Sequence, residues 1–325
     1  MNEELINLED LGMSDEELFS HFDHSEIESE KITAPRYSYW RSVFRVFFKK
    51  KINIVILILL LLVIIFSYIY PMVMPYDQFA RISNYDSWHL TPSVAFERLG
   101  FSLHTLLGTG GAGQPTWDAI WYGAQTSISL AFVCAVINMF IGVLIGAVWG
   151  FSKKVDIIMT EVFNIVSNVP YILLISVLVL IFSPSFLTMV FALTVTGWLG
   201  IAYFIRTQVI IIRDREYNLA SRCLGTSIFR IAFKNILPFM TSVIVTLGAA
   251  EIPAYISYEV YLSYLGLGMK SETPSLGRLI ESAQGAMAQF PWEFWSPVAI
   301  TSIIAIVLYV VGQNLGDASD PRTHM

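Results

Sequence analysis

The stretch "EYNLASRCLGTSIFRIAFKNILP", from Glu216 to Pro238, lies between two long apolar segments and decides how the chain is organised. It contains one glycine, Gly225, and ends in Leu237-Pro238. Its four charged side chains are Glu216, Arg222, Arg230 and Lys234. Because a transmembrane helix needs about 20 mainly apolar residues, this polar, helix-prone stretch predicts a rigid loop outside the lipid.

The composition is that of a polytopic membrane protein. Of the 325 residues, 55% are hydrophobic and 14% are charged, and the mean hydropathy is +0.60. A soluble domain of this size carries roughly 25% charged residues. Eleven acidic residues lie within the first thirty, so we expect residues 1–34 to form a solvated acidic tail. A cleaved signal peptide is not expected there, because such a signal needs a basic start.

Six segments are long and apolar enough to predict transmembrane helices, and Pro170 lies inside the third. They cover residues 52–70, 126–151, 156–182, 186–212, 239–265 and 297–311. Since the number is even, both termini lie on one side. With a cytoplasmic N-terminus, the inner segments hold sixteen Lys and Arg residues and the outer segments four. The positive-inside rule therefore places both termini and the 213–238 loop in the cytoplasm.

Residues 35–51 predict an interfacial amphipathic helix on the inner leaflet. Its apolar face holds Trp40, Val43, Phe44 and Phe47, and basic residues lie on the opposite face.

Residues 71–125 and 266–295 are expected to be extracellular. The second of these segments predicts a short helix that covers the mouth of a pathway. Gly142, Gly146 and Gly150 recur every fourth residue on the second span, which predicts the close approach of a neighbouring helix.

The sequence lacks the motifs of an ATP-binding or catalytic protein. "GTGGAG" (108–113) matches G-x-G-x-x-G but is followed by Pro115 and has no βαβ context, and no G-x-x-x-x-G-K-[ST] occurs. Cys134 and Cys223 have no metal-binding spacing. All five histidines lie outside the predicted spans. We therefore expect no enzyme activity from this chain.

Two carboxylates of the fifth span are candidates for a substrate path. Glu251 lies near mid-depth, Pro253 follows it, and Glu259 is two turns further out. A carboxylate beside a proline kink can face an aqueous path. The alternative is a buried carboxyl group satisfied by neighbouring hydroxyls or backbone groups. Both interpretations stay open for Glu251, and the second is favoured for Glu259.

The 213–238 loop predicts two short helices joined by a turn. Asp214 is expected to cap the first helix, which runs through Leu224. Gly225 then supplies the left-handed residue that ends it. Ser227 is expected to cap a second helix from Ile228 to about Ile236.

This loop resembles the "EAA" loop of ABC importer permeases, whose pattern is E-A-A, three residues, Gly, and a run ending in I-x-L-P. Aligned on Gly225, Ala220 and Leu237-Pro238 match the pattern. Leu219 replaces the usual glutamate, and Asn235 stands at the isoleucine position.

Other segments resemble the second permease subunit of oligopeptide and dipeptide importers, especially those of Gram-positive bacteria. These segments are "HTLLGT" (104–109), "WYGAQTSISL" (121–130) and "NLGDASDPR" (314–322). The resemblance implies an all-α membrane protein with the type I ABC importer fold, six transmembrane helices and a cytoplasmic coupling helix. The permease core would cover residues 126–313, followed by a cytoplasmic tail at 314–325.

The resemblance also implies ATP-driven import of oligopeptides by alternating access in the cell membrane. The partners would be a homologous permease subunit forming a heterodimer, two cytoplasmic ATPase subunits that use ATP and Mg²⁺, and an extracellular peptide-binding lipoprotein. This chain would be non-catalytic and would bind neither cofactor, metal nor nucleic acid. The implied ATPase-coupling surface consists of Leu219, Ala220, Ser221, Arg222, Cys223, Leu224 and Gly225.

Two alternatives remain. Importers of nickel or another small solute share this architecture. A secondary transporter would need inverted repeats with paired broken helices, whereas the sequence shows one span interrupted by Pro and Glu and no matching half.

Overall fold

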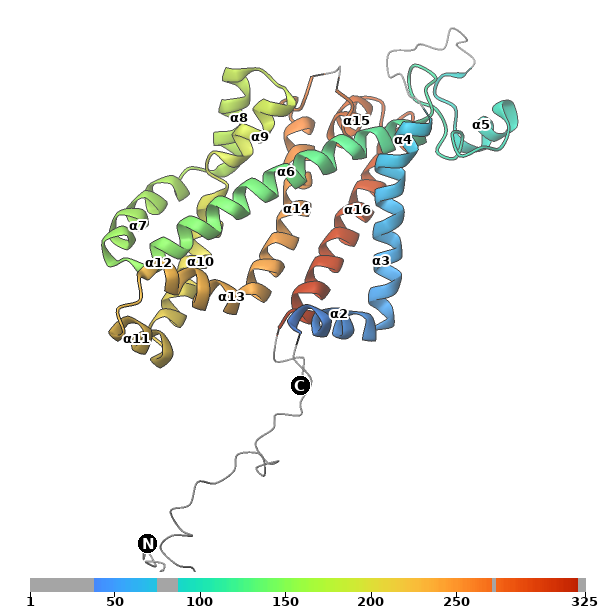
Figure 1. Ribbon diagram of the computed structural model, residues 1–325. Helices are drawn as coiled ribbons and strands as arrows, with labels where there is room; N and C mark the ends of the chain where they lie inside the picture. The colour runs from blue at the N-terminus through green and yellow to red at the C-terminus, as the bar shows by residue number, and fades with distance from the viewer. Residues whose placement is uncertain (1–37, 75–86, 271–272, 321–325) are drawn as a thin grey trace, which may run out of the picture. The chain divides into compact units, whose positions relative to one another are not determined.

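The computed structural model describes residues 38–74, 87–270 and 273–320, so the acidic tail expected at 1–34 lies outside the described residues. The described elements are helices, with one isolated β-bridge between Thr109 and Pro115. Five stretches are long and apolar enough to cross a membrane: Lys51–Val73 (α3, η3 and α4), α6 (Thr116–Phe151), Phe186–Arg213 (α9 and α10), α14 (Thr241–Tyr264) and α16 (Pro291–Ala318). A sixth results when the bent pair α7 (Lys153–Ser167) and α8 (Tyr171–Phe182) counts as one span (Figure 1).

Two spans are longer than the hydropathy pattern predicts. The second begins at Thr116 instead of residue 126. Its added turns contain Trp117, Trp121 and Tyr122, and such amphipathic aromatic residues are common at membrane–water interfaces. The last span runs beyond both ends of the predicted 297–311 segment and includes the first residues of the expected C-terminal tail.

Two other predicted spans are interrupted. The third bends by 77° between α7 and α8. Pro170 explains this bend, because proline has no amide hydrogen and disfavours helical backbone at the residue before it. The fourth is divided between α9 (Phe186–Thr194) and α10 (Trp198–Arg213). Val195 and Gly197 at this division keep right-handed helical backbone angles, and the two helices count together as one span. Irregular backbone at the Pro170 bend is tolerated at membrane depth where it lines a cavity or is covered by protein.

The glycines of α6 allow α10 to pack directly against it, as the sequence predicts. A Cβ atom added to Gly142 would lie 2.6 Å from the Ile201 side chain, and one added to Gly150 would lie 2.7 Å from Val209. Any side chain there would force the two helices apart. The α6–α10 pair is therefore closely packed along its length.

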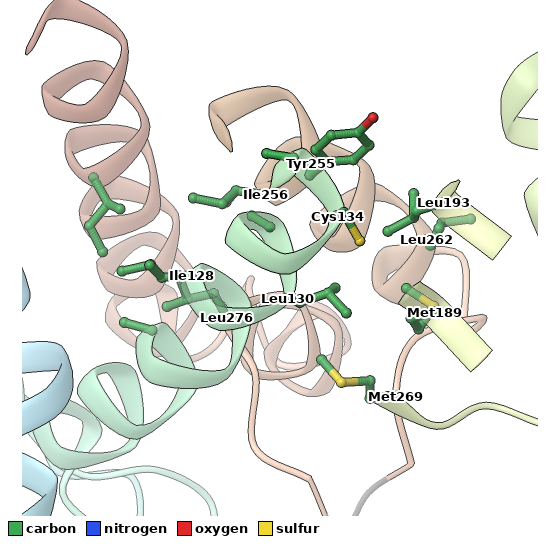
Figure 2. Close-up of a cluster of buried hydrophobic side chains, with 14 of the residues drawn as sticks. Ile128, Leu130, Cys134, Met189, Leu193, Tyr255, Ile256, Leu262, Met269 and Leu276 are labelled. Carbon is green, nitrogen blue, oxygen red and sulfur yellow. The ribbon is translucent and has the colours of Figure 1, made fainter. Parts of the chain in front are cut away.

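The main buried cluster joins α6, α9, α14 and α15 (Leu276–Gln284). Figure 2 shows Leu130 and Cys134 of α6 between Leu193 of α9 and Ile256 of α14. Leu276 of α15 belongs to the same cluster and is fully buried. The short helix predicted in the 266–295 segment is thus confirmed, and it is part of the core.

The predicted amphipathic helix forms as α2 (Tyr39–Lys49). Its buried side chains, Val43 and Phe47, pack with Ala318 at the end of α16. The apolar side chains left exposed are Trp40, Phe44 and Phe48. The apolar face is therefore divided between α16 and the surroundings, as suits a helix at a membrane surface.

Candidate functional site

The predicted 213–238 loop lies at the same end of the long helices as α2, and α15 lies at the opposite end (Figure 1). It consists of α11 (Glu216–Cys223), α12 (Ile228–Ile231), η5 (Ala232–Ile236) and α13 (Leu237–Phe239). Gly225 has φ +78°, which confirms the left-handed residue that ends the first helix. The Ser227 hydroxyl accepts a hydrogen bond from the Arg230 amide (3.4 Å), which confirms the second cap.

The first cap differs from the prediction. Arg215 occupies the N-cap position of α11 and makes no side-chain cap bond. Asp214 is instead the C-cap of α10 and accepts a hydrogen bond from Arg213 (3.3 Å). The helix α10 ends at Arg213, one residue beyond the predicted span, and α11 begins at Glu216, so the N-cap position falls on Arg215 and not on Asp214.

Asn218 anchors the loop, although the sequence pattern does not single it out. Its side chain is fully buried. Its amide nitrogen donates to the Ile212 carbonyl (3.0 Å), and its amide oxygen accepts from Asn235 (3.2 Å). One side chain thus ties α11 to the end of α10 and to η5. Because Ile212 belongs to α10 and Asn235 to η5, the spacing of residues within α11 does not indicate that Asn218 is a structural residue.

The inner side of the loop is buried on α6 and α10. Ile231 and Ile236 pack with Phe151 and Val209 in one apolar cluster. The Arg222 guanidinium lies 5.8 Å from the centroid of the Phe151 ring, within range of a cation–π contact. These contacts join the loop to the ends of two membrane helices.

The outer side of the loop exposes apolar side chains. Six of the seven predicted coupling residues are exposed, and Ser221 is half-buried. Leu224, at the tip, is 86% exposed. Other large apolar side chains exposed on the loop include Tyr217, Leu219, Ile228, Phe229, Phe233 and Phe239. An apolar surface on a rigid base is typical of a protein-docking site.

An ion-pair cluster lies near the same end of the helices. Asp156 of α7 accepts from Arg206 of α10 (2.5 Å) and from Trp149 of α6 (2.9 Å). The Arg206 guanidinium also faces the rings of Trp149 and Tyr203, at 5.8 and 5.5 Å from their centroids. The cluster thus links α7 to the same two helices that carry the loop.

A pocket of about 430 Å³ lies between α7, α8, α10 and α14. Both interrupted spans contribute to its wall, through Pro170 and through Thr196 and Gly197. Glu251 is the only charged residue among the described residues that line it. The polar groups beside Glu251 are Ser167, Tyr171, Thr196, Tyr255 and Tyr258.

Hydrogen bonds hold the polar side of this pocket in place. Asn138 of α6 donates to the Tyr255 hydroxyl (2.5 Å) and to the Leu193 carbonyl (3.2 Å). The Tyr171 hydroxyl donates to the same carbonyl (2.7 Å). The Tyr255 hydroxyl faces the Glu251 carboxyl group one turn earlier on α14. Pro253 is buried, and α14 continues through it.

Glu259 does not line this pocket. It is fully buried and accepts hydrogen bonds from the hydroxyls of Ser127 (2.8 Å), Ser263 (3.0 Å) and Ser275 (2.7 Å). The Ser127 hydroxyl in turn accepts from the Leu276 amide (3.1 Å). We name Glu259 and these three serines the Glu259 cluster. It joins α14, α6 and the start of α15, as the alternative of a satisfied buried carboxyl group predicts.

The helical fold and the 213–238 loop are typical of the membrane domain of an ABC importer. Comparisons with known proteins lead to the same class. The family described as "Binding-protein-dependent transport system inner membrane component" matches residues 140–325. The N-terminal TM domain of oligopeptide transport permease C matches residues 38–92. The chain therefore belongs to the family of inner membrane components of binding-protein-dependent transport systems.

Individual relatives cover almost the whole chain. It is 42% identical over 312 residues to the oligopeptide transport system permease protein AmiD of Streptococcus pneumoniae, covering 95% of this chain and 98% of that protein. It is 30% identical to the dipeptide transport system permease protein DppC of Bacillus subtilis, covering 91% and 89%.

A solved structure of the MetNI methionine ABC transporter in inward-facing conformations matches with a TM-score of 0.53 at 17% identity. The match covers 62% of this chain and 96% of the transporter chain. The predicted all-α importer fold is confirmed.

Proposed function

We propose that this chain is a permease subunit of an ATP-driven importer that moves oligopeptides into the cell by alternating access. The observation that carries the proposal is the 213–238 loop, which has a buried, hydrogen-bonded base and an exposed apolar tip at Leu224. The permease names of AmiD and DppC support the substrate class. No P-loop motif occurs in the sequence, so the loop is proposed as the place where energy enters from another subunit.

The proposed assembly pairs this chain with a homologous permease subunit. Two ATPase subunits bind ATP and Mg²⁺ in the cytoplasm, and an extracellular lipoprotein delivers the peptide. This chain itself is proposed to be non-catalytic. Both of its termini are proposed to lie in the cytoplasm, which the basic residues of the inner segments support. A Gram-positive host is proposed from the resemblance of its sequence segments.

The structure suggests a route from the loop to the pocket. The loop base is packed on α10, and α10 is joined to α7 through Arg206 and Asp156. Further along α7, the Phe163 ring stacks on Tyr203 of α10 at 4.3 Å. Phe163 lines the pocket that contains Glu251. A displacement of the loop by an ATPase is therefore proposed to change the pocket wall through α10 and α7.

Uptake of a labelled oligopeptide by vesicles that hold the whole complex tests the function. We expect accumulation that requires ATP and the binding lipoprotein. ATP-independent uptake driven by an ion gradient would point to a secondary transporter. Accumulation of nickel but not of peptide would point to a different substrate class.

Replacement of Gly225 tests the coupling loop. Gly225→Val places a β-branched residue at φ +78°, a conformation that such residues rarely adopt. We expect loss of ATPase co-purification and of uptake while membrane insertion persists. Gly225→Asn is the matched control, since asparagine tolerates the left-handed region. Normal ATPase binding and uptake in the valine variant would refute the coupling assignment.

A further inference from the structure

We propose that the pocket around Glu251 binds an ammonium group of the transported solute, such as the amino terminus of a peptide, during passage. The inference rests on the proposed function and assigns a ligand chemistry to one place on the path. Glu251 lies ten residues from the start of the 24-residue helix α14, which is about 15 Å along its axis. The pocket is thus near the middle of the span.

Glu251 has no cationic partner among the described residues. Within the described part of the chain, no Lys, Arg or His forms an ion pair with this carboxyl group. Carboxylates inside membrane spans are costly and normally have a partner. Glu259, on the same helix, has its partners within the chain, because three serine hydroxyls donate hydrogen bonds to it. Glu251 is half-buried and opens into the pocket, so its partner can come from outside the chain.

Aromatic rings lie around Glu251 in the pocket. Tyr171, Tyr255 and Tyr258 all line the pocket. The Tyr171 and Tyr258 rings meet edge to face with centroids 5.2 Å apart, and the Tyr255 and Tyr258 centroids are 6.1 Å apart. Aromatic faces beside a carboxylate attract ammonium groups through cation–π contacts. Apolar solutes need no carboxylate, and anions would be repelled by it.

Hydrogen bonds within the chain already orient the polar groups of the pocket. The Tyr255 hydroxyl accepts from Asn138 (2.5 Å), which leaves its own hydrogen to be donated toward Glu251. Thr196 also lines the pocket. An ammonium group has three donors, and the Glu251 carboxyl group supplies acceptors for it. The volume of about 430 Å³ leaves room for the residue that carries the amine.

Direct binding to the assembled importer in lipid nanodiscs tests the inference without the binding lipoprotein. The probes are trialanine and N-acetyl-trialanine, measured by saturation-transfer NMR. We expect trialanine to bind and the acetylated peptide to bind about tenfold more weakly, as expected for loss of a charge-assisted hydrogen bond. Glu251→Gln is expected to weaken trialanine binding about tenfold and to remove the preference. Tyr258→Ala is expected to weaken trialanine binding severalfold.

Glu161→Gln is the matched control. Glu161 is an exposed carboxylate of α7 outside the pocket lining, so its replacement should leave binding unchanged. Equal binding of both peptides, no binding of either, or an unaltered preference in Glu251→Gln would overturn the inference.

Loss of the second permease subunit from the Glu251→Gln complex would also overturn the inference, because Glu251 would then pair with that subunit. ATP-dependent uptake is measured separately on the same complexes. Its absence in the wild type refutes the proposed function, whereas its presence without a peptide preference refutes only the ammonium site.

Discussion

Two carboxyl groups on one helix, Glu251 and Glu259, have opposite surroundings. Glu259 is enclosed by serines of α6, α14 and the α15 segment and has no exposed surface. Glu251, two turns earlier, opens into a pocket whose wall includes two interrupted helices. The comparison shows that a carboxylate in a membrane helix serves structure when the chain supplies its donors. Glu251 has the Tyr255 hydroxyl beside it but no cation among the described residues, and we propose that such a group is available to a solute.

The strongest way to test this contrast is to remove the Glu259 carboxyl group. Glu259→Leu leaves three buried hydroxyls without their acceptor, and we expect the free energy of unfolding to fall by about 3–5 kcal/mol. Titration of the purified chain with SDS in mixed micelles measures this loss. The control is Glu281→Leu, which breaks a partly exposed ion pair with Arg278 and should cost less than about 1 kcal/mol. Equal losses in both variants would mean that the Glu259 cluster has no special structural role.

Gly277→Ala tests the Glu259 cluster by adding a methyl group to it without removing a polar group. A Cβ atom added to Gly277 would lie 2.6 Å from the Ser263 hydroxyl and 2.7 Å from a Glu259 carboxyl oxygen. We therefore expect Gly277→Ala to lower the free energy of unfolding by about 1–3 kcal/mol. Gly285→Ala, at the end of α15, enters open space and should change it by less than about 0.5 kcal/mol. If the two alanines behaved alike, the close approach at Gly277 would be unimportant.

Ser275→Ala should have a smaller effect. Its hydroxyl donates to Glu259 and also accepts from the Arg278 amide at the start of α15 (3.1 Å). Loss of a helix cap and of one buried hydrogen bond predicts a decrease of about 1–2 kcal/mol in the same titration. The exposed Ser282 of the same helix is the control, and its replacement by alanine should be close to neutral. A neutral Ser275→Ala variant would indicate that the other two serines suffice.

Glu251→Gln should have the smallest effect on stability. The amide has nearly the same shape, and no ion pair within the described residues is lost. We expect a change of less than about 0.5 kcal/mol in the free energy of unfolding, although solute binding is expected to change. A loss comparable to that of Glu259→Leu would place Glu251 in a structural role and remove the contrast between the two groups.

Much of the coupling loop could be predicted from local sequence. Gly225 and Ser227 act at the positions expected, because a left-handed helix end and a serine cap depend on neighbouring residues only. Asp214 does not cap α11, because it serves as the C-cap of α10 and α11 begins one residue too late for it to be the N-cap. Asn218 was not predicted because its partners, Ile212 and Asn235, are brought to it by folding.

The sequence by itself determined the class of the protein. The lengths of the apolar segments predict the membrane spans, and the distribution of Lys and Arg predicts their orientation. The glycines at every fourth position of α6 predict a close contact with another helix. Each of these signals is carried by residues near one another in the chain.

Only the tertiary structure decided what surrounds Glu251 and Glu259. The sequence favoured a satisfied buried carboxyl group for Glu259 and left both interpretations open for Glu251, but it could not name the groups that contact either one. The difference lies in what other helices bring to each: Ser127 and Ser275 to Glu259, and a pocket opened by the breaks at Pro170 and Gly197 to Glu251. The environment of a buried charge depends on neighbours distant in sequence, so the role of each glutamate is decided by packing.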